Sequence, residues 1–137
     1  MAFALVTPLG VMRETEVESV VLPSALGEME ILPGHRPLLA LLVPGELRLR
    51  QGEQGESLVI DRGFVYVSRD RVVVTVEQAM RLQEVDVSAV ELAQRRAEEA
   101  LRAAAGQREA LDSEEIKRLE AKIRYQLAQK AVKNRYS

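Results

Sequence analysis

The sequence predicts an α+β protein, with an N-terminal antiparallel β-sandwich over residues 1–85 and a C-terminal antiparallel two-helix hairpin over residues 86–137. All five prolines lie at or before position 44 and seven of the eight glycines at or before position 63, which is typical of short strands joined by turns. Beyond about Val85 there is no proline and one glycine, and alanine becomes common, as expected of helices. The change in composition predicts the domain boundary.

The front of the chain contains seven apolar or alternating segments that we expect to be strands. Glu46–Gln51 alternates strictly, so that Leu47 and Leu49 face a core while the two arginines between them face water or a partner. The last two segments are apolar on both faces, which favours a sandwich whose central strands are buried on both sides. The segments are Phe3–Thr7 (ended by Pro8), Val17–Leu22 (ended by Pro23), Leu38–Val43, Glu46–Gln51, Ser57–Ile60, Phe64–Val67 and Val72–Val76.

A sharp corner is predicted at Leu32-Pro33-Gly34-His35. Proline presets φ at the second position of a type II turn, and glycine supplies the positive φ at the third. Pro37 then favours an extended backbone at the residue before it. Pro44-Gly45 predicts a second turn after the apolar run that follows.

Two capping signals predict the helical hairpin. Ser88-Ala89-Val90-Glu91 fits a capping box that starts a helix running to about Ala105 and stopped by Gly106. Asp112-Ser113-Glu114-Glu115 repeats the signal and starts a second helix, which runs to about Asn134.

The expected contact faces of the two helices differ in size. An alanine stripe removes little apolar surface from water, at ~0.8 kcal/mol per buried CH₂, which suits a hairpin that must detach. Alanine is also simply a good helix former, so both interpretations stay open. The first stripe is Ala89, Ala93, Ala97, Ala100 and Ala104, and the second is Ile116, Leu119, Ile123 and Leu127.

Composition excludes several classes of protein. With no Cys, the chain has neither disulfides nor a thiolate metal site. No run approaches the ~18 apolar residues of a membrane helix, and no basic segment with a long apolar core opens the chain. We therefore expect a soluble cytoplasmic protein.

The net charge of −2 conceals a strong asymmetry. Residues 117–137 hold seven Lys or Arg and one Glu, a charge of +6, so the remainder carries −8. Such a tail is either a solvated helix face or a surface for an acidic partner. Nucleic acid is an alternative partner, but only Tyr125 and Tyr136 could stack on bases, and the charges flank both sides of the apolar stripe. A helix that inserts its apolar edge between protein surfaces explains this pattern better, and no nucleic acid is expected.

Catalytic residues are not expected. His35 is the only histidine and has no cysteine to activate, and no serine lies in a Gly-x-Ser-x-Gly pattern. One histidine among scattered carboxylates does not form a transition-metal site. Gly52-Glu53-Gln54-Gly55 has acids and no lysine, which indicates a hairpin tip and not a phosphate loop. Three functional classes therefore stay open. The favoured class is a protein-binding subunit, and the alternatives are a nucleic-acid-binding protein and a small enzyme with its site around His35.

The segment Ile31–Leu39, which reads ILPGHRPLL, followed by Pro44-Gly45-x-Leu47, resembles the signature of the epsilon subunit of F-type ATP synthases. The resemblance extends over nearly the whole chain. Two positions depart from it, because Ser24 and Glu30 stand where glycines are usual. It implies a non-catalytic rotor subunit without a resident cofactor, peripheral to the cytoplasmic face of the inner membrane.

The resemblance also implies partners and contact residues. The sandwich would bind the gamma subunit and rest on the ring of c subunits, with Glu28 and His35 near the ring. The helical hairpin would fold down or extend along gamma and inhibit ATP hydrolysis against the alpha and beta subunits. The expected contacts to an acidic segment of beta are Lys117, Arg118, Lys122 and Arg124.

Some members of the family bind ATP at the hairpin through a pattern of Ile or Leu, Asp, two variable residues, Arg and Ala. Here Asp86 is retained, but Ala89 stands at the arginine position. Losing a guanidinium that pairs with phosphate costs roughly 1.5–3 kcal/mol. The resemblance therefore implies at most a weak regulatory ATP site, with Arg95, Arg96 and Arg118 as partial substitutes.

Overall fold

The structure is a computed structural model that describes residues 1–106 and 113–136. It divides into two compact units, Met1–Gln83 and Glu84–Ser137. The division falls two residues before the boundary expected from composition. In the part of the chain that the structure describes, no helix has the length and apolarity to cross a bilayer.

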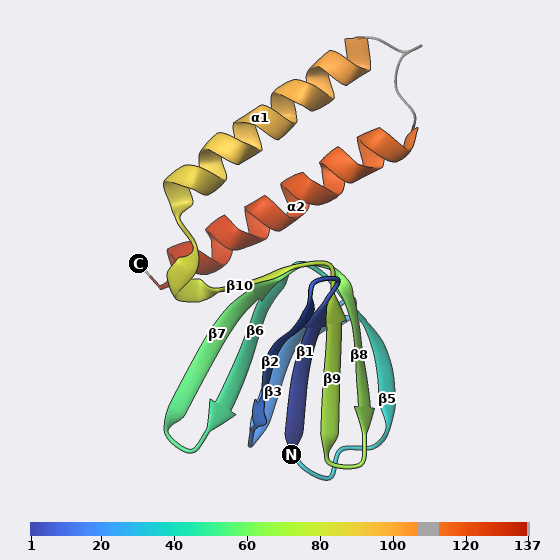
Figure 1. The fold of residues 1–137 in the computed structure, drawn as a ribbon, viewed down its shortest axis with the longest axis vertical. Helices are drawn as coiled ribbons and strands as arrows, with labels where there is room; N and C mark the ends of the chain where they lie inside the picture. The colour runs from blue at the N-terminus through green and yellow to red at the C-terminus, as the bar shows by residue number, and fades with distance from the viewer. Residues whose placement is uncertain (107–112, 137) are drawn as a thin grey trace. The chain divides into compact units, whose positions relative to one another are not determined.

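The first unit is a sandwich of two β-layers, which confirms the predicted fold class (Figure 1). One layer has the strand order β10-β7-β6-β3-β4 and the other β5-β8-β9-β1-β2. A single residue pair, Ser24 with Leu42, links β3 to β5, so the sheet folds over at this point. The strands are β1 Ala2–Thr7, β2 Gly10–Glu16, β3 Ser19–Ser24, β4 Gly27–Ile31, β5 Leu38–Leu42, β6 Gly45–Gln51, β7 Gln54–Ile60, β8 Gly63–Ser68, β9 Arg71–Val76 and β10 Ala79–Arg81.

The core lies between the two layers and is drawn from residues 3–76. Fully buried side chains such as Leu5, Leu47 and Ile60 each stabilise the fold by about 1.5–3 kcal/mol. Leu47 and Leu49 point inward and Arg50 is exposed, as predicted for β6, but the alternation is not strict, because Glu46 is buried and Arg48 is half-buried. At Gly63, a Cβ would lie 1.9 Å from the Thr75 carbonyl oxygen, so only glycine lets β8 pair with β9.

Several strand predictions were wrong in detail. Pro23 does not end β3, because its carbonyl accepts a hydrogen bond from the Val43 N–H at 3.0 Å and the residue pairs with Glu28. One pair of strands, β1 with β9, is parallel. Three strands were missed, β2, β4 and β10, because they are polar-rich or only three residues long.

The predicted corner is confirmed. The His35 N–H donates to the Leu32 carbonyl at 3.1 Å, and Gly34 has the positive φ, 83°, that a type II turn requires at its third position. The chain leaves this turn through Pro37 and enters β5 at Leu38.

The second unit contains α1 (Val87–Gly106) and α2 (Ser113–Arg135), after a 3-10 turn at Leu82–Glu84. The predicted cap of α1 was wrong: Asp86 caps it, because its Oδ1 accepts from the N–H groups of Ser88 at 3.0 Å and Ala89 at 3.3 Å. α1 also includes Gly106 instead of stopping before it. In the second predicted capping signal, Asp112 and the side chain of Ser113 lie outside the described residues.

The predicted contact faces are confirmed only in part. On α1, Ala97 and Ala104 are buried, but Ala89 and Ala100 are exposed. On α2, the first three members of the expected stripe are half-buried and Leu127 is exposed.

The most deeply buried apolar side chains of α2 are Ala121, Tyr125 and Val132. At about 100° per residue, these lie on the side of the helix opposite to Ile116 and Ile123. The second helix therefore has two apolar faces, where the sequence analysis expected one.

Candidate protein interfaces

An exposed apolar surface covers the outer side of the second β-layer. Leu39 pairs with Tyr66 and Leu41 with Phe64 across the β5–β8 ladder. The four side chains are 67%, 50%, 70% and 43% exposed in that order, although all are large and apolar or aromatic. We call these four residues the outer apolar face. Large exposed apolar patches on a folded domain mark sites where other proteins bind.

The same face continues across the layer with smaller side chains. Tyr66 pairs with Val73 on β9, and Phe64 pairs with Thr75, which in turn lies beside Val6 on β1. Val6 pairs with Val11 on β2, which is 61% exposed. The layer thus presents one side to the core and an apolar side outward.

The burial predicted for both faces of β8 was wrong. Phe64 and Tyr66 on β8 were expected to be buried, because a strand that is apolar on both faces is commonly covered on both faces by the same chain. The structure leaves the outer face of β8 uncovered. The same pattern is also produced when a strand is covered on one face by a partner, and that was the signal that could have identified the interface.

A second candidate surface is the β3–β4 hairpin, which contains the predicted contact residue Glu28. Glu28 lies on strand β4, and the turn before this strand exposes Leu26 completely. Ser24 stabilises this turn, because its Oγ donates to the Gly27 carbonyl at 2.5 Å and accepts from the Leu26 N–H at 3.2 Å. Glu28 is 65% exposed and forms an ion pair of 3.2 Å with Arg48.

The other residue predicted to face the ring, His35, is not close to Glu28. Glu28 lies near the start of β4, whereas His35 lies in the turn after its end, and β4 has five residues. At ~3.4 Å per residue the strand separates them by more than 10 Å. His35 is exposed, and its Nδ1–H donates to the Arg36 carbonyl at 2.7 Å.

The four cationic residues predicted to contact an acidic partner are all exposed on α2. Lys117 and Arg124, seven residues apart, lie on one side of the Ile116–Ile123 stripe, while Arg118 and Lys122 lie toward the other side. Arg124 forms an ion pair of 3.5 Å with Glu120, one turn away. An exposed pair of this kind contributes little to stability and leaves the guanidinium accessible.

The residues considered for ATP are not gathered at one point. Lys130 pairs with Glu91 at 3.5 Å, which sets the register of the antiparallel helices. With a rise of 1.5 Å per residue, Arg118 then lies about 25 Å along the hairpin from Asp86, and Arg95 about halfway between them. The Asp86 carboxylate is also already used as the helix cap.

No metal site is formed in residues 1–106 and 113–136, where no three His, Cys, Asp or Glu side chains come together.

Comparison with known proteins gives a consistent family. Residues 1–82 match the family described as ATP synthase, Delta/Epsilon chain, beta-sandwich domain. The ATP synthase epsilon chain of Geobacter metallireducens is 36% identical over 129 residues, which cover 94% of both chains. That of Anoxybacillus flavithermus is 38% identical over 100 residues, covering 73% of this chain and 75% of the relative.

Two solved structures share the fold. A chain of the Euglena gracilis mitochondrial ATP synthase, solved with OSCP, F1 and the c-ring, superposes with a TM-score of 0.68 at 22% identity, covering 95% of this chain and 79% of that one. A chain of the Tetrahymena thermophila mitochondrial ATP synthase central stalk and c-ring gives 0.54 at 18% identity, covering 62% and 69%. The predicted resemblance is confirmed: the chain belongs to the family of F-type ATP synthase epsilon chains.

Proposed function

We propose that this subunit of a rotary enzyme complex performs no chemistry itself. Its sandwich binds the gamma subunit and rests on the c-ring, and its helical hairpin inhibits ATP hydrolysis by contacting the alpha and beta subunits. The c-ring would hold it at the cytoplasmic face of the inner membrane, as a peripheral protein.

The main support for this proposal is the outer apolar face of the sandwich. A rotor subunit must transmit torque without dissociating, and permanent interfaces are more apolar than transient ones. The aromatic side chains Phe64 and Tyr66 are suited to be the anchors of such an interface. We assign this face to gamma, the partner that turns with the subunit.

The β3–β4 hairpin suits the c-ring better. It is a small projection with one exposed leucine and the charged pair Glu28–Arg48, and polar loops of a ring can hydrogen-bond to such a tip. His35 lies away from this tip, and we propose that it contacts the ring or gamma separately from Glu28.

The helical hairpin suits a reversible inhibitor. All five positions of the α1 stripe are alanine, so this stripe exposes little apolar area when α1 separates from what it packs against. The exposed cations of α2 can meet an acidic segment of beta on both sides of the apolar stripe. Each state of such an element must make different contacts, as a two-state switch requires.

Co-purification with gamma tests the assignment of the outer apolar face. We expect the double substitution Phe64→Ala and Tyr66→Ala to weaken gamma binding by about 100-fold, since anchor residues contribute about 1–2 kcal/mol each. Because both side chains are exposed, thermal unfolding of the isolated subunit should change little.

The matched control is Val21→Ala, which removes an apolar side chain from the outer side of the other layer, where Val21 pairs with Glu30 and Arg48. The Val21→Ala variant should bind gamma as tightly as the wild type. If the double variant binds gamma as tightly as the wild type, gamma binds elsewhere on the subunit.

A further inference from the structure

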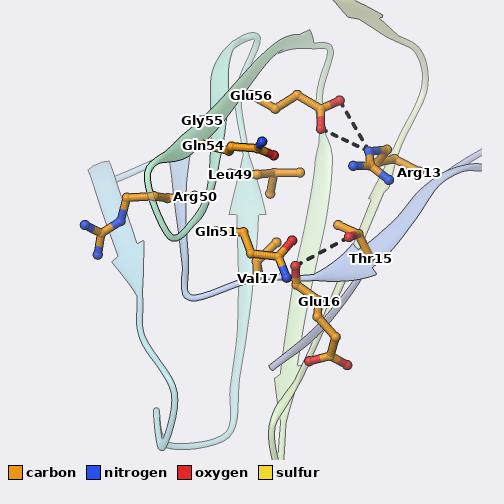
Figure 2. A pocket seen from close by; sticks show the side chains of 10 residues that line it. All are labelled: Arg13, Thr15, Glu16, Val17, Leu49, Arg50, Gln51, Gln54, Gly55 and Glu56. Atoms are coloured by element: carbon orange, nitrogen blue, oxygen red, sulfur yellow. Dashed lines mark hydrogen bonds and ion pairs between the residues drawn. The ribbon is translucent and has the colours of Figure 1, made fainter.

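The two end strands of the folded sheet, β2 and β10, are not joined by a backbone ladder. Ion pairs connect them instead. Arg13 on β2 donates from Nε to both carboxylate oxygens of Glu56 on β7, at 3.0 and 3.3 Å, and Arg81 on β10 approaches the same carboxylate at 4.0 Å. Figure 2 shows Arg13 and Glu56 facing each other at one side of a small pocket.

The register places all three charged residues on the core side of their strands. Arg13 pairs with the buried Leu5, Glu56 with the buried Leu49, and Arg81 with the buried Leu58. Charges that point inward at a sheet edge prevent other strands from adding to it. Here opposite charges meet across the gap, so they also attract the strands to each other.

The pocket beside this cluster is not suited to a ligand. Its volume is about 180 Å³, below the ~300 Å³ at which small-molecule sites begin. Its most enclosed charged groups, Arg13 and Glu56, already neutralise each other. The cluster is better explained by the strands that it joins.

β10 is the shortest strand of the sandwich. It has only three residues, Ala79, Met80 and Arg81, none of them fully buried, and it pairs with β7 alone. Its beginning is held firmly, because the buried Asp61 accepts from the Gln78 side chain at 3.1 Å and its N–H donates to the Gln78 carbonyl at 2.9 Å. At its end, the ion pair between Arg81 and Glu56 adds to the ladder with β7.

We propose that β10 can separate from β7 while its start stays bound through the Asp61–Gln78 hydrogen bonds. The ion pair Glu56–Arg81, which we call the latch, holds its end in place. When the latch opens, β10 separates from β7 as far as Gln78, and three more residues join the connection to the helical unit, which begins at Glu84. At ~3.3–3.6 Å per residue this lengthens the connection by about 10 Å.

Arg13 competes with Arg81 for the same carboxylate and sets the strength of the latch. This mechanism is a property of the sandwich itself. Its use in extending an inhibitory hairpin rests on the proposed function.

Hydrogen exchange on the full chain, followed by mass spectrometry of peptides covering residues 77–84, tests the proposal. We expect Glu56→Gln to speed exchange in this segment about three- to tenfold, because the neutral side chain leaves Arg13 and Arg81 facing each other. Raising NaCl from about 0.05 to 0.5 M should speed it in the wild type and have little effect in the variant.

Two further variants separate a latch from a general stabilising role. Arg13→Gln frees Glu56 for Arg81, so exchange in residues 77–84 should stay the same or slow down. Arg50→Gln removes an exposed arginine that lines the same pocket and should change nothing.

The proposal is wrong if Glu56→Gln leaves exchange in β10 unchanged, if it speeds exchange equally in all strands, or if Arg13→Gln loosens β10 as Glu56→Gln does. None of these measurements depends on ATP hydrolysis, so the latch and the inhibitory function succeed or fail separately.

Discussion

At the scale of single residues, Asp86 has a structural role that its sequence context concealed. Two backbone N–H groups at the start of α1 have no carbonyl partner within the helix, and the Asp86 carboxylate accepts from both. A carboxylate at this end also interacts favourably with the helix dipole. Ser88, the cap expected from sequence, lies inside the helix instead.

Replacing Asp86 by Ala should therefore destabilise the helical unit by about 1 kcal/mol. The loss should appear as faster hydrogen exchange in the first turns of α1. Ser88→Ala is the matched control and should have a much smaller effect, because it leaves the Asp86 carboxylate in place. A larger effect from Ser88→Ala would restore the capping box as the correct interpretation.

At the scale of elements, the helical hairpin distributes its charges along its length. Asp86, Arg95 and Arg118 are placed at successive levels, so they cannot all reach one triphosphate. We therefore propose that ATP is at most a weak regulatory ligand of this chain.

Calorimetry of the isolated subunit should show millimolar ATP binding or none. Ala89→Arg should strengthen binding by about 10- to 100-fold, since it returns a phosphate-pairing guanidinium to an exposed position close to Asp86. Ala100→Arg, at an exposed position farther along α1, is the control and should not. Micromolar binding by the wild type would overturn this expectation.

At the scale of the whole molecule, the two units differ in what stabilises them. The sandwich has a continuous core drawn from residues 3–76, so it should fold without the helices. Among its described residues, the helical unit buries three alanines, three valines, one tyrosine and two glutamines, with no run of large apolar side chains comparable to the sandwich core. This difference in packing is consistent with the proposed function, in which the sandwich is the rigid rotor part and the hairpin moves.

A chain that ends at Val87 should retain a cooperative unfolding transition and still assemble into the motor. If the hairpin inhibits hydrolysis, the assembled motor should hydrolyse ATP faster than the one with the complete subunit. Steady-state ATPase measurements on both decide this. Equal rates would refute the inhibitory role while leaving the assignment of the sandwich intact.

The fold class, the corner at Leu32–His35, the inward leucines of β6 and the family could all be predicted from the amino-acid sequence. These depend on local chemistry: proline and glycine dictate turns, and alternation dictates which side of a strand is buried. Helix caps were harder to predict, because two neighbouring residues, Asp86 and Ser88, can both cap and only the backbone geometry chooses between them.

The exposed apolar faces and the ion pairs between distant residues could not be predicted from the sequence and follow from the three-dimensional arrangement of the strands. Phe64 and Val65 are both apolar, yet Phe64 is 43% exposed and Val65 is fully buried, because the first layer (β10-β7-β6-β3-β4) covers only one side of β8. Likewise Arg13, Glu56 and Arg81 lie far apart along the chain and come together only because the sheet folds over on itself. Burial and ion pairing depend on which strands are neighbours in the folded sheet. The apolar and polar pattern within a single strand does not specify those neighbours.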